Sequence, residues 1–158
     1  RDYQHEMELV VAIGASGFRV AEADAPSLVW GYACGLDMTR RDLQRVAREA
    51  GKPCDLAKNF EGAAVLSGIV PKAGADVLQS GAISLQVNGL TRQSGNLAQL
   101  IWSIPELIAD LSRFYHLQPG DLIFTGTPEG VSAVVPGDRL TGRIEGVGEI
   151  TLTIGEAE

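Results

Sequence analysis

Continuous apolar runs and two-residue alternations of apolar and polar positions recur along the chain, and both patterns predict β-strands. The first run, Leu9–Ile13, is aliphatic and rich in β-branched residues, the composition of a buried strand. A second run covers residues 28–36 and ends at Asp37. Residues 83–93 alternate around Asn88-Gly89, a strong signal for a β-hairpin.

Shorter patterns predict the remaining strands. Residues 63–71 contain another apolar run, and residues 139–145 and 149–154 form a closing pair of strands joined by a glycine-containing turn. Residues 51–62 show no clear period, so we expect an irregular loop there. The chain as a whole is therefore expected to be rich in strands.

Helix signals are fewer. Thr39 is a suitable N-cap and Gly51 a suitable C-cap for a helix between them, and Asp24 could cap a short helix. Asn96 is expected to cap a helical region that Pro105 bends or divides. Its core face is marked by apolar residues at helical spacing: Leu97, Leu100, Ile101, Ile104, Leu107, Ile108 and Leu111.

Composition limits the class of protein. The 158 residues suit one domain, and 45% hydrophobic with 21% charged residues is an ordinary globular balance. A net charge of −7 argues against a nucleic-acid partner, which requires a basic face. No apolar run is long enough to span a membrane. Cys34 and Cys54 have no metal-type spacing, so we expect a cytoplasmic protein with free thiols.

Two carboxylates precede the first apolar run. Glu6 and Glu8 are two positions apart, so a strand would point both to the same face, while His5 and Met7 would point to the other. Burying two unpaired like charges is costly, and a divalent cation between them would resolve this. The alternative is a solvated strand face. His5 is expected to be a packing residue, or to support the site from behind the ligands, rather than to bind the cation directly.

Other polar residues could border such a site. Asp37 ends a predicted strand just before a helix, where Arg41 and Gln44 share one face. Lys58 lies in the predicted loop, in partly apolar company. The alternative for each is a solvated surface position. His116 follows a helical region and is expected to be structural.

A glycine-rich loop provides a possible anion site. Gly126-Thr127-Pro128 could bring backbone and hydroxyl donors close to an anion. It is not a nucleotide-binding P-loop, because the Gly-Lys-Ser/Thr ending is absent.

These pieces, in this order, resemble the fumarylacetoacetate hydrolase family, and within it the acylpyruvase branch that contains fumarylpyruvate and maleylpyruvate hydrolases. The resemblance implies an α+β fold, a rolled, mixed β-sheet with a few short helices, and a homodimer. It covers nearly the whole chain, as a single catalytic domain over residues 1–158. The matching segments are residues 5–9, 31–44, 57–60, 87–89 and 120–131.

The resemblance also assigns roles to residues. It implies Glu6, Glu8 and Asp37 as ligands of Mg²⁺ or Mn²⁺, which agrees with the preference of these hard cations for oxygen ligands. The family's site lysine corresponds to Lys58, expected to be catalytic and to contact substrate. The other implied substrate-binding residues are Arg41, Gln44 and Thr127.

The implied activity is metal-dependent hydrolysis of a carbon–carbon bond in an acylpyruvate, in aromatic catabolism. The substrate would be a small anionic 2-oxo acid, fumarylpyruvate or maleylpyruvate. Alternatives are an oxaloacetate decarboxylase, a 2-oxo acid isomerase or hydratase of the same fold, or a catalytically silent metal-binding fragment. The family's general base is a His-Glu pair upstream of the metal-binding strand. Neither His5 nor His116 matches it, so we expect an N-terminally truncated domain.

Overall fold

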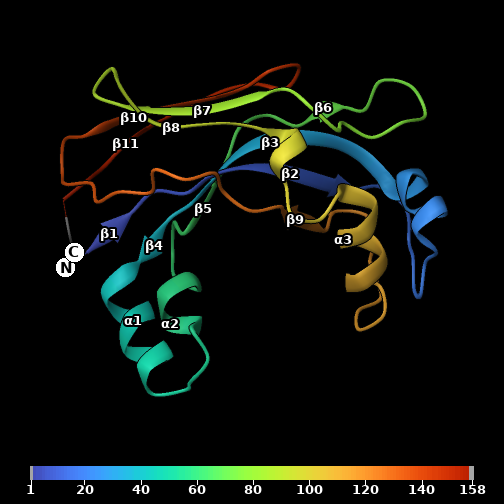
Figure 1. Ribbon diagram of the computed structural model, residues 1–158, viewed down its shortest axis with the longest axis horizontal. Coiled ribbons are helices and arrows are strands. Elements are labelled where there is room, and N and C mark those ends of the chain that lie inside the picture. The colour runs from blue at the N-terminus through green and yellow to red at the C-terminus, as the bar shows by residue number, and fades with distance from the viewer. Residues whose placement is uncertain (1, 157–158) are drawn as a thin grey trace.

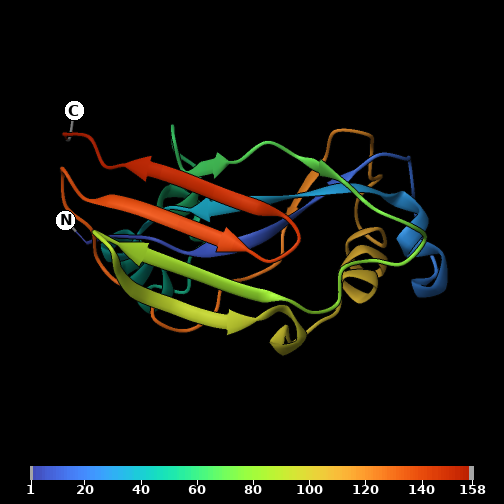
Figure 2. The same ribbon diagram turned by 90° about the horizontal axis from the view of Figure 1, so that it is seen from above.

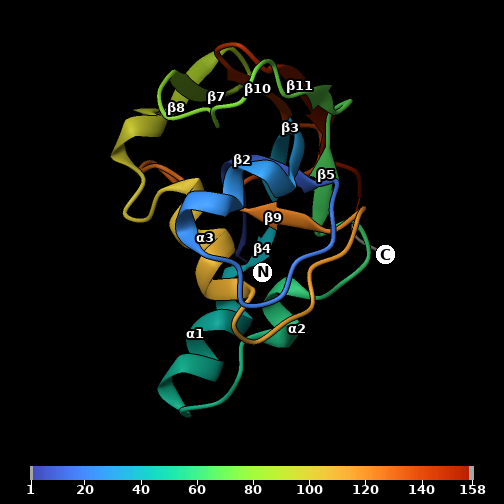
Figure 3. The same ribbon diagram turned by 90° about the vertical axis from the view of Figure 1, so that its right-hand side faces the viewer.

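Residues 2–156 are described by the computed structural model, in which two β-sheets face each other (Figures 1 and 3). The larger sheet has the order β5-β3-β2-β9, with β6 also paired to β3. The smaller has the order β11-β10-β7-β8, and its strands run antiparallel above the larger sheet (Figure 2). A third, two-stranded sheet joins β1 and β4.

The larger sheet is built around β2. This strand, Met7–Ile13, is buried at every position and pairs antiparallel with β3, Val29–Asp37, and β9, Leu122–Phe124. The strands β5, Ala64–Leu66, and β6, Val70–Pro71, add to β3. The two apolar runs of the sequence thus form the two central strands, as predicted.

The smaller sheet contains the predicted hairpin and closing pair. Its strands are β7, Ala82–Val87; β8, Leu90–Asn96; β10, Arg139–Ile144; and β11, Gly148–Thr153. The β7–β8 turn has φ of 53° at Asn88 and 79° at Gly89. Positive φ at both central residues is what a type I′ turn needs, and Asn-Gly tolerates it best.

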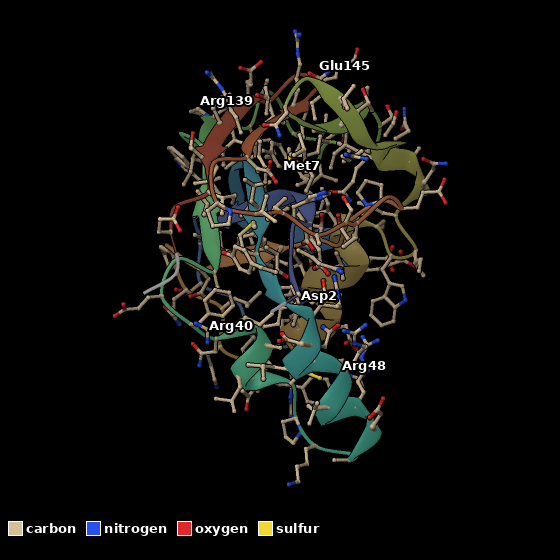
Figure 4. The ribbon with its side chains drawn as sticks, turned by 90° about the vertical axis from the view of Figure 1, so that its left-hand side faces the viewer. Asp2, Met7, Arg40, Arg48, Arg139 and Glu145 are labelled. Carbon is tan, nitrogen blue, oxygen red and sulfur yellow. The ribbon has the colours of Figure 1, made fainter. Side chains whose placement is uncertain are left out.

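The core fills the space between the two sheets. Met7 of β2 is completely buried and lies in the interior, well away from Arg40 and Arg48 at the helical end (Figure 4). Gly142 of β10 faces it: a Cβ at that position would lie 2.4 Å from Met7 Sδ. The sheets therefore meet closely at the residue that separates Glu6 from Glu8.

The helices flank the larger sheet at its two ends (Figure 1). At one end are α1, Arg41–Glu49, and α2, Asp55–Lys58. At the other are η1, Glu22–Leu28, and α3, Ile104–Leu111, while η2, Leu97–Gln99, follows β8. No helix among the described residues is long and apolar enough to cross a membrane.

Two predicted helix starts are wrong. Thr39 does not cap α1. It belongs to β4, Thr39–Arg40, which pairs with β1, Tyr3–Gln4, so the N-cap is Arg40 and the helix begins one residue later than predicted. Pairing with a distant strand overrides the local capping signal. The η1 helix begins at Glu22, before the predicted cap Asp24, and its N-cap is Ala21.

The helical region after Asn96 is divided, but not by Pro105. Asn96 forms the predicted cap of η2, and the helix is then interrupted. The α3 helix starts anew after Ser103, whose hydroxyl accepts a hydrogen bond from Glu106 N–H, and Pro105 lies in its first turn. Ile101, assigned to the core face, is 95% exposed in the interruption.

Candidate metal centre

Three carboxylates converge where β2 and β3 lie side by side. One oxygen each from Glu6, Glu8 and Asp37 can be chosen so that all lie within 4.8 Å of one another. The β2–β3 register places Met7 opposite Leu36. It therefore brings Asp37, the last residue of β3, beside the two glutamates. The predicted convergence is present.

Glu6 does not belong to the strand, contrary to the prediction. It lies in a two-residue break between β1 and β2, which begins only at Met7. Its carbonyl still accepts the Asp37 N–H at 2.9 Å, so the backbone remains close to β3. Glu6 and Glu8 are neighbours, as predicted from strand alternation, although β2 starts one residue after Glu6.

Two basic side chains already contact the carboxylates. Lys58 Nζ lies 2.6 Å from Glu6 Oε2 and 2.6 Å from Asp37 Oδ2. Arg41 forms an ion pair with the other oxygen of Glu6. Part of the positive charge expected between the carboxylates is therefore supplied by the protein itself. Lys58 reaches the site because it ends the short helix α2, where a loop was predicted.

Glu8 differs from the other two carboxylates. It is 5% exposed, and its Oε2 accepts a hydrogen bond of 2.8 Å from Gly126 N–H. Among residues 2–156, no lysine, arginine or histidine forms a salt bridge with it. Burial, together with the negative charges of Asp37 and Glu6, raises its pKa from 4.5 to about 7, against the opposing effects of Gly126 N–H and Lys58.

The basic contacts separate the pKa values of the other two acids. Burial raises the pKa of Asp37, although the Lys58 ammonium opposes the rise. Burial also acts to raise the pKa of Glu6, but Lys58 and Arg41 together outweigh it and bring that pKa below its usual value. Glu8 is thus the carboxylate of the cluster whose charge is least compensated by neighbouring cations, and its raised pKa favours the protonated form.

The donor set fits a hard divalent cation. It consists of carboxylate oxygens, without sulfur or imidazole ligands in the cluster, and such sets suit Mg²⁺ and Mn²⁺. Glu8 is buried without a cationic partner among the described residues, which an isolated carboxylate tolerates poorly.

Arg41 is held in place by neighbours on both sides. Its Nε donates to Gln4 Oε1 at 2.8 Å, and one terminal nitrogen donates to the buried Gln44. Arg41 and Gln44 therefore border the cluster, as predicted. Sequence reasoning missed Gln4, although it precedes Glu6 by two positions, the spacing that first drew attention to Glu8.

The glycine-rich loop lies against β2. Thr127 Oγ1 donates to Met7 O at 2.8 Å and accepts from Gln93 Nε2 at 2.8 Å. Gln93, on β8, is completely buried and was not identified from the sequence. The predicted substrate-binding threonine is thus anchored next to the carboxylates through its hydroxyl.

The two histidines have structural partners. His5 is completely buried, with Nδ1 2.9 Å from Gln93 Oε1 and Nε2 2.9 Å from Ser132 Oγ. His116 stacks on Phe18, with 3.9 Å between ring centroids. Both have structural contacts, in line with the structural roles predicted for them.

Two enzymes are similar in sequence to this chain over nearly its whole length. It is 61% identical over 157 residues to the fumarylpyruvate hydrolase of Ralstonia sp., an alignment covering 99% of this chain and 81% of that protein. It is 43% identical over 147 residues to the mitochondrial oxaloacetate tautomerase of Rattus norvegicus, covering 93% and 66%.

A solved structure shares the fold. The fumarylpyruvate hydrolase from Pseudomonas aeruginosa, crystallised with Mn²⁺ and pyruvate, superposes with a TM-score of 0.96 at 47% identity, covering 99% of this chain and 67% of that one. The predicted fold class is thereby confirmed. Residues 1–155 match the family described as fumarylacetoacetate (FAA) hydrolase, C-terminal. The chain belongs to the fumarylacetoacetate hydrolase family, as its motifs predicted.

Proposed function

We propose that the protein is a divalent-metal-dependent hydrolase that cleaves a carbon–carbon bond of an acylpyruvate, fumarylpyruvate or maleylpyruvate, to pyruvate and a dicarboxylic acid. The observation that carries the proposal is the carboxylate cluster, in which Glu6 and Glu8 are buried and Asp37 is partly exposed, in a chain 61% identical to a fumarylpyruvate hydrolase. The predicted enzyme class, a hydrolase of carbon–carbon bonds, agrees with that relationship.

Glu6, Glu8 and Asp37 are the proposed ligands of Mg²⁺ or Mn²⁺. Their closeness and the lack of a cationic partner for Glu8 among residues 2–156 support this, as does the Mn²⁺ in the Pseudomonas aeruginosa structure. When bound, the ion would supply positive charge that polarises the keto oxygen of a 2-oxo acid.

Lys58 is the proposed catalytic cation of the chain. Its ammonium has three N–H donors, and the carboxylates of Glu6 and Asp37 account for two of them. The third can donate to negative charge that develops on the substrate as the bond breaks. Arg41 is the proposed partner of a substrate carboxylate, and its contacts with Gln4 and Gln44 support this role by holding the guanidinium beside the cluster.

Proton transfer requires a further group. His5 has both ring nitrogens engaged in buried contacts, and His116 is stacked on Phe18, so neither is placed as a general base. The upstream His-Glu pair implied by the family resemblance stays a prediction, and the catalytically silent alternative depends on it.

Oxaloacetate is the second candidate substrate. Relatives at 43% identity and below are named oxaloacetate tautomerases, an isomerase activity on another small 2-oxo dicarboxylate. The same cluster and the same basic residues could bind it. The higher identity to the Ralstonia fumarylpyruvate hydrolase favours the acylpyruvate.

The proposal is tested by metal binding and turnover measured together. We expect the protein, stripped with EDTA and reloaded with Mn²⁺ or Mg²⁺, to release pyruvate from fumarylpyruvate or maleylpyruvate faster than it converts oxaloacetate. Asp37→Asn should weaken Mn²⁺ binding in calorimetry at least tenfold, as loss of a charged ligand implies. Asp76→Asn, at an exposed aspartate, is the matched control. Unchanged Mn²⁺ affinity in Asp37→Asn would contradict the assignment.

We further propose that the protein acts in the cytoplasm as a homodimer, in the degradation of aromatic compounds. Support comes from the family resemblance and from Cys34 and Cys54, both of which are free thiols. Light scattering after size exclusion should give twice the mass of one chain; a single-chain mass would refute the dimer.

A further inference from the structure

Gln93 lies between the strand β2, which carries Glu8, and the glycine-rich loop that contains Thr127. It lies on β8, in the smaller sheet, and is completely buried. Its amide oxygen accepts the Met7 N–H at 3.0 Å and contacts His5 Nδ1 at 2.9 Å. Its amide nitrogen donates to Thr127 Oγ1 and to Pro128 O, both at 2.8 Å. One buried side chain thus joins the carboxylate strand to the glycine-rich loop.

The orientation of this amide is determined by its partners. Met7 N–H can only donate and Pro128 O can only accept, so the oxygen and nitrogen of Gln93 cannot be exchanged. His5 Nδ1 must then carry the proton that points to Gln93. Every hydrogen-bonding group of the Gln93 amide is used, so an incompletely matched replacement would leave a buried polar group without its partner.

The fixed orientation of the Gln93 amide also determines the direction of the Thr127 hydroxyl hydrogen. Because it accepts from Gln93 Nε2, its own hydrogen is directed to Met7 O. That hydrogen is therefore not available to a substrate carboxylate. The backbone N–H of Thr127 has no acceptor within residues 2–156. Because Gly126 N–H is bound to Glu8 and Pro128 has no N–H, it is the donor that Gly126-Thr127-Pro128 can present to an anion.

A second contact fixes the far end of the loop on the same strand. A Cβ at Gly130 would lie 2.0 Å from Arg92 O, the residue before Gln93, and Gly130 has a φ of 98°. Nothing larger than glycine fits there without moving the backbone. The loop is thus held against β8 at both Gln93 and Gly130, and Gly126 N–H reaches Glu8 from that position.

We propose that Gln93 is a positioning residue, which holds the loop so that the Thr127 backbone N–H faces the substrate carboxylate. The inference rests on the proposed function, because it concerns how that site binds a 2-oxo acid. Gln93 does not touch the substrate; it acts through the Thr127 hydroxyl and Pro128 O.

Gln93→Glu tests this role most directly. It keeps an acceptor for Met7 N–H and His5 but loses the two amide N–H donors to Thr127 and Pro128. In protein loaded with Mn²⁺, we expect it to weaken pyruvate binding roughly tenfold and to raise KM more than it lowers kcat. Mn²⁺ affinity, measured separately, should change less than pyruvate affinity. Gln86→Glu, at an exposed position of β7, is the matched control.

Variants of Thr127 show whether its hydroxyl only joins the loop to Gln93 (the tether) or contacts the bound pyruvate directly. Thr127→Val should weaken pyruvate binding about as much as Gln93→Glu, and Thr127→Ser should recover most of the loss. The double variant should be no weaker than Gln93→Glu alone, because both changes break the same tether. If Thr127→Val weakens pyruvate binding further in the Gln93→Glu background, the hydroxyl contacts the ligand and the inference is wrong.

Folding and the proposed function are controlled in the same experiment. Should Gln93→Glu fail to fold, the Thr127 pair decides, because Thr127 is only half-buried. A native protein that binds neither Mn²⁺ nor pyruvate overturns the proposed function together with the inference. A native protein that binds both, with Gln93→Glu indistinguishable from Gln86→Glu, overturns only the role of Gln93.

Discussion

The raised pKa of Glu8 predicts a specific pH dependence of stability in the metal-free protein. Its carboxyl is buried, lies beside two other acids and, among residues 2–156, accepts from a single N–H donor, that of Gly126. Folding therefore favours the protonated form of this group. The folded protein should hold a proton on Glu8 in a pH range where the unfolded chain has already lost it.

The sign and size of the effect follow from linkage. A folded pKa above the unfolded value gives stability that is complete below the unfolded pKa of 4.5 and is lost as pH rises through the folded pKa of about 7. A rise of this size corresponds to roughly 3 kcal/mol of unfolding free energy. His5 acts in the opposite direction, because burial lowers its pKa and stability is lost as it protonates. The Glu8 contribution must therefore be isolated.

Glu8→Gln isolates it, because the amide mimics the protonated acid and keeps an acceptor for Gly126 N–H. Urea unfolding in EDTA at several pH values gives both free energies of unfolding. The value for the native protein minus that for Glu8→Gln should fall by about 3 kcal/mol between about pH 4 and about pH 8. Glu61→Gln, at an exposed glutamate, controls for the change in net charge. A difference that stays flat across this range would refute the reasoning.

Three further substitutions test the ion pairs of the site, the contact between the two sheets and the cap of α3. Lys58→Met should destabilise the metal-free protein by roughly 2 kcal/mol, because its carboxylate partners lose their cation, and Mn²⁺ should then raise Tm more than in the native protein. Gly142→Ala should cost about 1–3 kcal/mol in urea unfolding, and should weaken Mn²⁺ binding by displacing Met7. Ser103→Ala should cost about 1 kcal/mol through loss of the α3 cap while Mn²⁺ affinity stays unchanged.

The pair Glu6 and Glu8 could be found from the sequence because its signal is local, whereas Asp37 is implied as a ligand only by the family resemblance. Glu6 and Glu8 stand two positions apart beside a buried strand, and Asp37 ends the next long apolar run. The register between β2 and β3 then brings Asp37 beside the two glutamates. The β7–β8 hairpin was predictable for the same reason, since its turn needs positive φ where Asn88 and Gly89 stand.

Other features depend on contacts between distant parts of the chain. Gln93 is 88 positions from His5 in sequence, and no local pattern marks it as a partner of β2. Thr39 carries a good capping signal that pairing between β1 and β4 overrides. The sequence predicts a loop around Lys58, because a helix as short as α2 leaves no periodic pattern.

The charges of the site imply an order of binding. Three carboxylates face the cations of Lys58 and Arg41, so the metal-free cluster is net negative once Glu8 ionises. The whole chain also carries a net charge of −7, so a 2-oxo acid is repelled both locally and overall. A divalent ion reverses the local sign and leaves Lys58 and Arg41 free to favour an anion. Metal should therefore bind before substrate, and substrate affinity should fall with the same pH dependence as metal affinity when Glu8 is protonated.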